Sequence, residues 1–136
     1  MKYLIDASAL VRILRRQVDP RWEELVRRGV VAVCEPAIIE TLATVAAREY
    51  QRTEDRLRDA YLPVPLPDNS WDIVASVRRE LAKHSVHQGV SVADHLVVAT
   101  AIRLKLTVLH EDGDFETVVR HIPQLKQARV SVPPAE

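Results

Sequence analysis

The chain has 136 residues, and its 19 lysine and arginine side chains balance its 19 aspartate and glutamate side chains. This length fits a single domain over residues 1–136, and the balanced charge excludes a global field that draws the protein onto nucleic acid or acidic lipid. No apolar run approaches the roughly 18 residues of a bilayer-spanning helix and no signal-like segment opens the chain, so we expect a cytoplasmic protein without membrane association. The single cysteine, Cys34, excludes an intrachain disulfide and fits a small buried residue.

The chain opens with MKYLIDASAL, in which an apolar run over residues 3–5 ends at Asp6. This pattern predicts a buried strand with a carboxylate at its end, followed by a helix over residues 9–16. In open α/β sheets the carboxyl ends of the strands line the ligand crevice, so Asp6 could face a functional edge. It could equally cap the following helix, for which Ser8 is another candidate N-cap.

Apolar runs and helical periodicities then alternate along the chain. Further helices are predicted over residues 20–28, 36–46, 52–60, 71–83, 92–104 and 115–121, and further strands over residues 30–34, 107–109 and 129–132. Three prolines between residues 61 and 67 predict a loop or a short edge strand. Strands that alternate with helices favour an α/β fold, with a parallel sheet flanked by helices.

Two acidic residues lie within or beside apolar helix faces. Asp94 is one turn into a very apolar helix, where a carboxylate needs a partner, although Ser91 and Asp94 also have the spacing of a capping box. Glu40 neighbours the apolar stripe of its helix, but glutamates are also common on helix surfaces. Each residue therefore has a structural explanation as well as a functional one.

Two more acidic residues, Asp112 and Asp114, follow the strand predicted over residues 107–109. Asp112 takes the same topological position as Asp6, at the carboxyl end of a strand. The alternative is a tight turn around Gly113 that is stabilised by aspartate side chains.

The acids are more informative as a group than singly. Two strand ends of a parallel sheet, together with two of the helices that flank it, can bring them to one edge. Clustered carboxylates repel one another unless they are protonated or bridged by cations. Oxygen ligands without a nearby cysteine or a fixed pair of histidines suit Mg²⁺ or Mn²⁺ better than zinc. Such ions neutralise charge and activate water in phosphodiester hydrolysis, so the pattern predicts a metal-dependent nuclease.

Arginine supplies most of the positive charge, in clusters of which the first is Arg12, Arg15 and Arg16. A guanidinium group binds phosphate through two hydrogen bonds at once, which suits an RNA or DNA ligand. Arginines also cover ordinary helix surfaces, so this signal alone decides nothing.

Four motifs together resemble the PIN domain of VapC-type toxins, in order and spacing, over essentially the whole chain. They are D-A-S-A-L from Asp6, P-A-I-I-E ending at Glu40, S-V-A-D-H-L-V-V-A-T-A around Asp94, and L-H-E-D-G-D-F around Asp112. The resemblance implies an α/β/α sandwich with a central parallel sheet and an acidic site for Mg²⁺ or Mn²⁺. It also implies an endoribonuclease that acts as the toxin of a toxin–antitoxin pair, is restrained by a cognate VapB antitoxin, and forms a homodimer.

The resemblance also assigns roles to individual residues. Asp6, Glu40, Asp94 and Asp112 match the acidic catalytic positions of the family. Asp114 matches a further acid of some members, and Ser8 matches a hydroxyl residue that holds the first acid or a bound water. His110 departs from the pattern, because many members carry Thr or Ser near the fourth acid. A histidine there could contact substrate or water bound to the metal, or be a solvated or hydrogen-bonded side chain.

The resulting hypothesis is hydrolysis of RNA phosphodiester bonds. Asp6, Asp94 and Asp112 would hold the metal ion, with Asp114 completing the site. Glu40 would orient or deprotonate the attacking water. Arg12, Arg15 and Arg16 would hold the RNA backbone at the border of the crevice.

Two alternatives belong to other functional classes. A phosphotransfer domain of the receiver or phosphatase type also places Asp at strand ends beside Mg²⁺. The phosphatase needs a second Asp two residues after Asp6, but this position is Ser8. The receiver needs a lysine at a late strand end. Lys105 and Lys126 do not fit that requirement. A non-catalytic binding module with the same fold is the other alternative, and the presence of all the matched acids argues against it.

Overall fold

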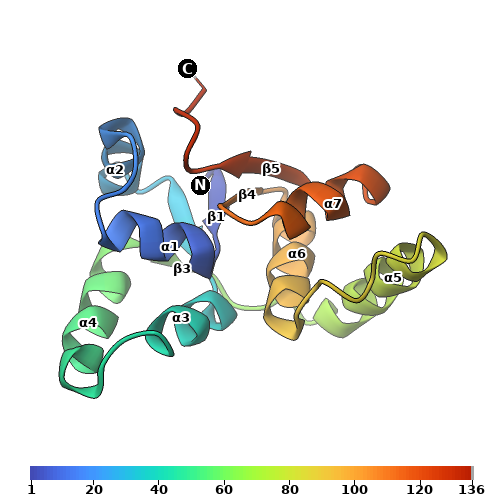
Figure 1. The fold of residues 1–136 in the computed structure, drawn as a ribbon, viewed down its shortest axis with the longest axis horizontal. Coiled ribbons are helices and arrows are strands. Elements are labelled where there is room, and N and C mark those ends of the chain that lie inside the picture. The colour runs from blue at the N-terminus through green and yellow to red at the C-terminus, as the bar shows by residue number, and fades with distance from the viewer. Residues whose placement is uncertain (136) are drawn as a thin grey trace.

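The computed structural model describes residues 1–135, and in it five parallel strands form one sheet with helices on both faces (Figure 1). The strands are β1 (Tyr3–Ile5), β2 (Val31–Val33), β3 (Leu62–Pro63), β4 (Thr107–His110) and β5 (Lys126–Arg129). The helices are α1 (Ala7–Leu14), α2 (Pro20–Arg27), α3 (Glu35–Leu42), a 3₁₀ turn η1 (Ala47–Glu49), α4 (Tyr50–Ala60), α5 (Ser70–Lys83), α6 (Val92–Leu104) and α7 (Gly113–His121). The order across the sheet is β3-β2-β1-β4-β5, so the predicted α/β/α sandwich with a central parallel sheet is confirmed.

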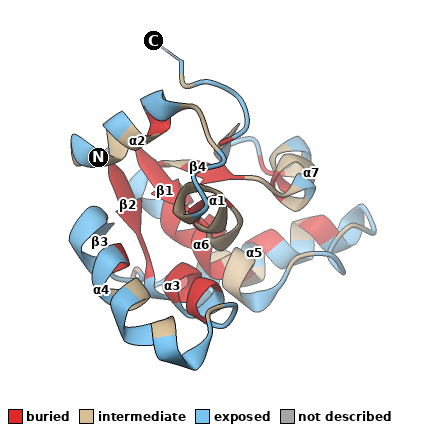
Figure 2. Ribbon diagram, turned by 60° about the vertical axis from the view of Figure 1, so that its left-hand side comes forward, coloured by how far each residue is buried: buried red, intermediate tan, exposed pale blue. Residues whose placement is uncertain are grey.

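The core lies on both faces of the sheet, because successive side chains of a strand point to opposite sides. In β1, Leu4 belongs to the apolar cluster that α5, α6 and α7 cover. Tyr3 and Ile5 belong to the cluster covered by α1, α2, α3 and α4. The central strands are therefore buried on both faces, as their colour in Figure 2 shows. A sheet buried in this way holds the ends of its strands in fixed positions.

The helices that follow the central strands begin at one edge of the sheet. Asp6 caps α1 directly after β1, Cys34 occupies the N-cap position of α3 directly after β2, and Asp112 caps α7 two residues after β4. Cys34 is buried as expected, and burial raises the pKa of its thiol to about 11. Side chains at the starts of these helices consequently meet at the carboxyl edge of the sheet.

The predicted position of the last strand was wrong. The sequence pattern favoured residues 129–132, whereas β5 is Lys126–Arg129 and pairs with β4 from Thr107 to His110. The strand lies at the edge of the sheet and is only partly buried, so its residues are polar and lack the apolar pattern of a central strand. The chain after β5 turns towards α2, where the Trp22 indole N–H donates to the carbonyl oxygen of Val132 at 2.8 Å.

Several helix boundaries also differ from the prediction, because α1 spans Ala7–Leu14 instead of residues 9–16 and α4 begins at Tyr50 instead of residue 52. Helix α3 ends at Leu42, four residues early, and the Thr44 N–H donates to the Thr41 carbonyl oxygen in a tighter turn. Helix α7 begins at Gly113, so Asp114 lies in its first turn rather than in a preceding loop. Among the helices of residues 1–135, none combines the length and the apolar content that a bilayer crossing requires.

Candidate metal centre

Asp6 stands at the end of β1 and is almost completely buried, with 3% of its surface exposed. Its backbone N–H donates to the carbonyl oxygen of Leu109 in β4, which fixes the residue between two central strands. Its carboxylate accepts the Ala9 N–H at 3.1 Å and thereby caps α1. Burial raises the pKa of Asp6, while the hydrogen bonds from Ser8 and Ala9 lower it in part. Asp6 therefore caps α1 and also lies at the carboxyl edge of the sheet.

Ser8 joins the two segments that carry the strand-end acids. Its hydroxyl donates to the Asp6 carboxylate, whose oxygens lie 2.8 and 2.9 Å away, and it accepts the backbone N–H of Glu111 at 2.8 Å. One hydroxyl thus links the β1–α1 segment to the β4–α7 segment. This contact supports the predicted role of Ser8 in holding Asp6.

Asp112 and Asp114 form the start of α7. The Asp112 carboxylate accepts the Asp114 N–H at 3.0 Å, so the turn predicted around Gly113 is present. Burial raises the pKa of Asp114, and the neighbouring charge of Asp112 raises it further. The loop before α6 approaches closely, because a Cβ atom at Gly89 would lie 3.3 Å from a carboxylate oxygen of Asp114.

Asp94 lies in the first turn of α6 and faces the other acids. The Ser91 hydroxyl accepts the Asp94 backbone N–H at 3.1 Å, as in one half of the capping box. Burial raises the pKa of the Asp94 carboxyl to about 7, and the charges of Asp6, Glu40 and Asp112 contribute in that order. A half-buried carboxyl surrounded by three acids is therefore the electrostatic centre of the group.

The predicted acids divide into an inner and an outer set. Asp94, Asp112 and Asp114 each offer a carboxylate oxygen within 4.8 Å of the other two. Asp6 and Glu40 stand outside that triplet, although the charge of each raises the pKa of Asp94. Glu40 is exposed on α3, whereas Asp6 is buried at the sheet edge.

The residues at this edge fit a hard divalent cation. The three converging groups are all carboxylates, and Mg²⁺ and Mn²⁺ favour oxygen ligands. Burial is the main reason that the pKa of Asp94 is raised, and a cation would relieve the repulsion from the other acids that adds to it. These donors fit Mg²⁺ or Mn²⁺ and do not distinguish one from the other.

The arginines predicted to hold RNA lie away from this centre. Arg12 is in the last turn of α1, and Arg15 and Arg16 follow that helix, so they lie about 9 to 15 Å along the helix axis from Asp6. Arg15 lines a hollow of about 230 Å³ between α1 and α4, and Arg16 lines an adjoining one of about 190 Å³. Arg56 of α4, which was not among the three arginines predicted to hold RNA, lines both hollows. Within residues 1–135, none of these four arginines has an ion-pair partner.

His110 is fully buried at the end of β4, and both of its ring nitrogens have hydrogen-bond partners. Of the two possibilities raised by the sequence, the hydrogen-bonded side chain is therefore the correct one. Sequence patterns missed its partner Gln127, because the residue lies on β5, whose position was predicted incorrectly. Lys126 begins β5 instead of ending it, so the structure supplies no late strand-end lysine there for a receiver domain.

A comparison with protein families matches residues 3–120 to the PIN domain. The chain belongs to the PIN domain family. Among curated relatives of this PIN domain chain, Ribonuclease VapC6 of Mycobacterium tuberculosis is 34% identical over 101 residues, which cover 74% of the chain and 80% of the relative. Ribonuclease VapC2 of the same species is 32% identical and covers 98% of the chain and 96% of the relative.

Solved structures of toxin–antitoxin complexes share the fold of this PIN domain chain. The DNA-bound VapBC from Salmonella typhimurium has a TM-score of 0.75 at 14% identity and covers 95% of this chain and 98% of that chain. VapBC-5 from Mycobacterium tuberculosis has a TM-score of 0.68 at 22% identity, with the same coverage of 95% and 98%. At these identities the likeness concerns the fold, and it agrees with the family match.

Proposed function

We propose that this chain is a divalent-metal-dependent endoribonuclease that acts as the toxin of a VapBC-type pair. The observation that carries the proposal is the convergence of three carboxylates at one edge of the sheet, with the charges of Asp6 and Glu40 acting on Asp94. The relatives named as ribonucleases and the PIN domain match favour RNA as the substrate. In the proposal Asp94, Asp112, Asp114 and Asp6 hold the ion, which is Mg²⁺ or Mn²⁺.

The proposed chemistry is hydrolysis of one phosphodiester bond. A bound divalent ion would supply positive charge to the phosphoryl oxygens and lower the pKa of a water molecule. Glu40 orients the water and takes its proton, because its carboxylate is exposed beside the triplet. The water oxygen bonds to phosphorus, the bond from phosphorus to O3′ breaks, and O3′ gains a proton from solvent. The products carry a 5′-phosphate and a 3′-hydroxyl.

The RNA backbone is proposed to lie along α1 into the hollows beside α4. Ser8, Arg12 and Arg15 are spaced by four and three residues, so they share one face of the helix. Ser8 contacts Asp6 at the start of this helix face, and Arg15 lines the hollow at its other end, so the face runs from the acids to the arginines. Arginines without acidic partners are free to bind phosphate groups.

The proposed protein partners are a VapB-type antitoxin and a second copy of the chain. Support for an antitoxin comes from the neighbours with the same fold, whose structures are of VapBC complexes. Support for self-association is a hollow of about 620 Å³ beside β3 that is lined by Met1 and Leu104, which are 62% and 40% exposed. Light scattering on the purified chain measures its oligomeric state.

The decisive test replaces Asp94, the centre of the acidic group, by asparagine. We expect D94N to lower RNA cleavage by roughly 100-fold or more, because it removes a charged ligand whose contribution to catalysis is several kcal/mol. Cleavage of total RNA by the purified chain is measured with Mg²⁺ or Mn²⁺, and in EDTA as a blank. Circular dichroism checks that the variant is folded.

The matched control is D72N, the same change at an exposed aspartate of α5, outside the acidic group and away from the hollows beside α4. We expect this variant to cleave RNA at the wild-type rate. Full activity of D94N, or cleavage that persists in EDTA, would contradict the proposed metal centre.

A further inference from the structure

The environment of His110 links the acidic site to the edge strand of the sheet. Its Nδ1 atom lies 2.9 Å from the backbone nitrogen of Asp112, and its Nε2 atom lies 2.6 Å from the side-chain oxygen of Gln127. The ring is 0% exposed and packs against Phe115, with 5.1 Å between the ring centroids. A histidine held in this way cannot reach substrate or solvent.

The direction of these hydrogen bonds follows from their chemistry. The Asp112 backbone N–H can only donate, so Nδ1 of His110 accepts. The ring then carries its proton on Nε2, which donates to the Gln127 side-chain oxygen. Gln127 pairs with Val108 in the β4–β5 ladder, so its backbone is fixed by the sheet. The chain of contacts therefore runs from the sheet, through two side chains, to the backbone of an acidic ligand candidate.

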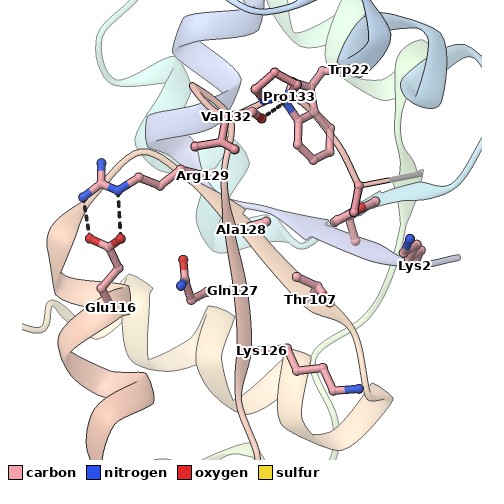
Figure 3. A pocket seen from close by; sticks show the side chains of 12 residues that line it. Lys2, Trp22, Thr107, Glu116, Lys126, Gln127, Ala128, Arg129, Val132 and Pro133 are labelled. Atoms are coloured by element: carbon pink, nitrogen blue, oxygen red, sulfur yellow. Dashed lines mark hydrogen bonds and ion pairs between the residues drawn. The ribbon is translucent and has the colours of Figure 1, made fainter.

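A second residue of β5 holds the same segment. Arg129 lies two residues after Gln127 and extends to the same side of the strand, towards Glu116 (Figure 3). Its guanidinium donates to Glu116 at 2.6 and 3.0 Å and to Glu111 at 2.8 Å. The Glu111 carboxylate also accepts the Ser131 N–H at 3.0 Å. Strand β5 thus contacts the β4–α7 segment on both sides of Asp112.

We propose that His110 and Gln127 are positioning residues for Asp112: the Gln127 side chain fixes the His110 ring, and the ring fixes the backbone of Asp112, so that its carboxylate meets those of Asp94 and Asp114. The inference rests on the proposed function only in taking the acidic triplet as a metal site. The family match ends at residue 120, so Gln127 and the rest of β5 lie beyond the residues it covers. The site therefore depends on a strand outside that match.

The size of the expected effect follows from other metal sites. Groups that hold a metal ligand through a hydrogen bond change the metal affinity by about 10- to 100-fold when they are removed. The contact here is to the backbone of the ligand instead of its carboxylate, so we expect the lower end of that range. Removal of the acceptor also leaves the Asp112 N–H without its partner.

The test compares two replacements of His110 by their binding of Mn²⁺ without RNA. H110L keeps an apolar side chain in the buried position but has no acceptor for the Asp112 N–H. H110N places an amide oxygen at the position of Nδ1, so it retains the acceptor but loses the contact with Gln127 and the ring packing against Phe115. We expect H110L to weaken Mn²⁺ binding by roughly 10-fold and H110N to recover most of that loss. The affinity is measured by titration with Mn²⁺ followed by electron paramagnetic resonance.

Gln127 gives a second variant that does not depend on a change in the core. Its side chain is only partly buried, so Q127L should fold even if H110L does not. In the wild type, nitrogen NMR of the His110 ring should show one tautomer with the proton on Nε2. In Q127L, the Asp112 N–H still holds this tautomer, but the Nε2 proton loses its acceptor, so the resonance of that proton should shift and Mn²⁺ binding should weaken by a few-fold. The control is T100V, which removes a buried hydrogen bond to the Leu96 carbonyl oxygen in α6 and should leave Mn²⁺ affinity unchanged.

The outcomes separate this inference from the proposed function. Wild-type affinity in both H110L and Q127L, or an equal loss in H110L and H110N, would overturn the positioning role even if the chain cleaves RNA. If the Mn²⁺ affinities rank as expected but the wild-type chain cleaves no RNA, the positioning role stands and the proposed nuclease function is refuted. A wild-type chain that binds no Mn²⁺ would overturn both.

Discussion

At the scale of single residues, burial and mutual repulsion disfavour the charged forms of the clustered carboxylates. A bound cation or a proton relieves that repulsion. Asp94 shows this most clearly, because its pKa of about 7 lies well above the ordinary value of 3.8. Asp6 and Asp114 are shifted in the same direction, mainly by burial. Near neutral pH, the metal-free site therefore retains a proton that the unfolded chain would release.

This difference predicts how the stability of the metal-free chain depends on pH. Between the unfolded pKa of 3.8 and the folded pKa of about 7, the folded state binds more protons, so its stability falls as the pH rises. In EDTA we expect the thermal midpoint to decrease from about pH 5 to pH 8. D94N lacks this titration and should be more stable than the wild type at pH 8 by on the order of 1 kcal/mol, or about 4 °C.

Thermal unfolding followed by circular dichroism measures both midpoints across the pH range. Addition of excess Mn²⁺ at pH 8 should restore the stability of the wild type and change D94N little, since ligands that bind the folded state stabilise it. Equal pH slopes for the two proteins in EDTA would contradict the proposed state of Asp94.

The strand-end acids and the contact of Ser8 with Asp6 were predictable from the sequence, whereas the contacts that come from distant segments were not. Asp6 directly follows one short apolar strand and Asp112 stands two residues after another, as the local sequence pattern predicted. The partner of His110 is 17 residues away on an edge strand, and the N–H that the Ser8 hydroxyl accepts belongs to a residue 103 positions away. Such pairs depend on which strands become neighbours, and no local pattern encodes that.

At the scale of elements, α6 and β5 illustrate why some positions were predicted well and others poorly. Helix α6 is buried and has a serine N-cap, so its periodicity and its start were clear, and the predicted span of residues 92–104 is confirmed. Strand β5 is partly exposed and polar, and the apolar residues that follow it were taken for the strand. Buried elements have a clearer sequence pattern because their positions require apolar residues. Exposed positions accept many residue types, so their pattern is weaker.

The hollows between α1 and α4 give a prediction about RNA binding. We expect R15A and R56A each to weaken binding of a short oligouridine by about 3-fold or more and to lower the salt dependence of binding by roughly 0.7 in slope, as for one lost phosphate contact with a single strand. Fluorescence anisotropy in EDTA measures affinity without cleavage, at several salt concentrations.

The control for these variants is R79A, which removes the same charge from an exposed position of α5. It should bind RNA as the wild type does. Binding of an acidic peptide with the same net charge as the oligouridine is measured for comparison. If R15A and R56A bind RNA unchanged but lose affinity for the peptide, the hollows serve a protein partner and not the substrate.

At the scale of the whole molecule, the acidic group results from where the parallel strands end. The parallel sheet brings Asp6 and Asp112 to one edge, although they are more than a hundred residues apart in sequence. The start of α6 adds Asp94 from the helical layer on one face, and α3 adds Glu40 from the other face. The fold thereby collects acids from both layers of helices around one point.

The proposed partner gives a prediction for the intact protein in cells. Expression of the chain alone should arrest growth, because an unrestrained ribonuclease degrades essential RNA. Co-expression with the product of a small neighbouring open reading frame should restore growth, and the two proteins should copurify. D94N expressed alone is the control and should permit growth. Normal growth with the wild-type chain alone would contradict the toxin role.

The dependence of Asp112 on β5 has a practical consequence for how the boundary of this domain is drawn. A recombinant fragment cut at residue 120 would contain every acid of the proposed centre and would cover the whole family match. It would nevertheless lack Gln127 and Arg129, and it would leave β4 as a bare edge with unpaired backbone groups and exposed apolar side chains. Such a fragment would aggregate before its chemistry could be assayed, so its inactivity would say nothing about the acids.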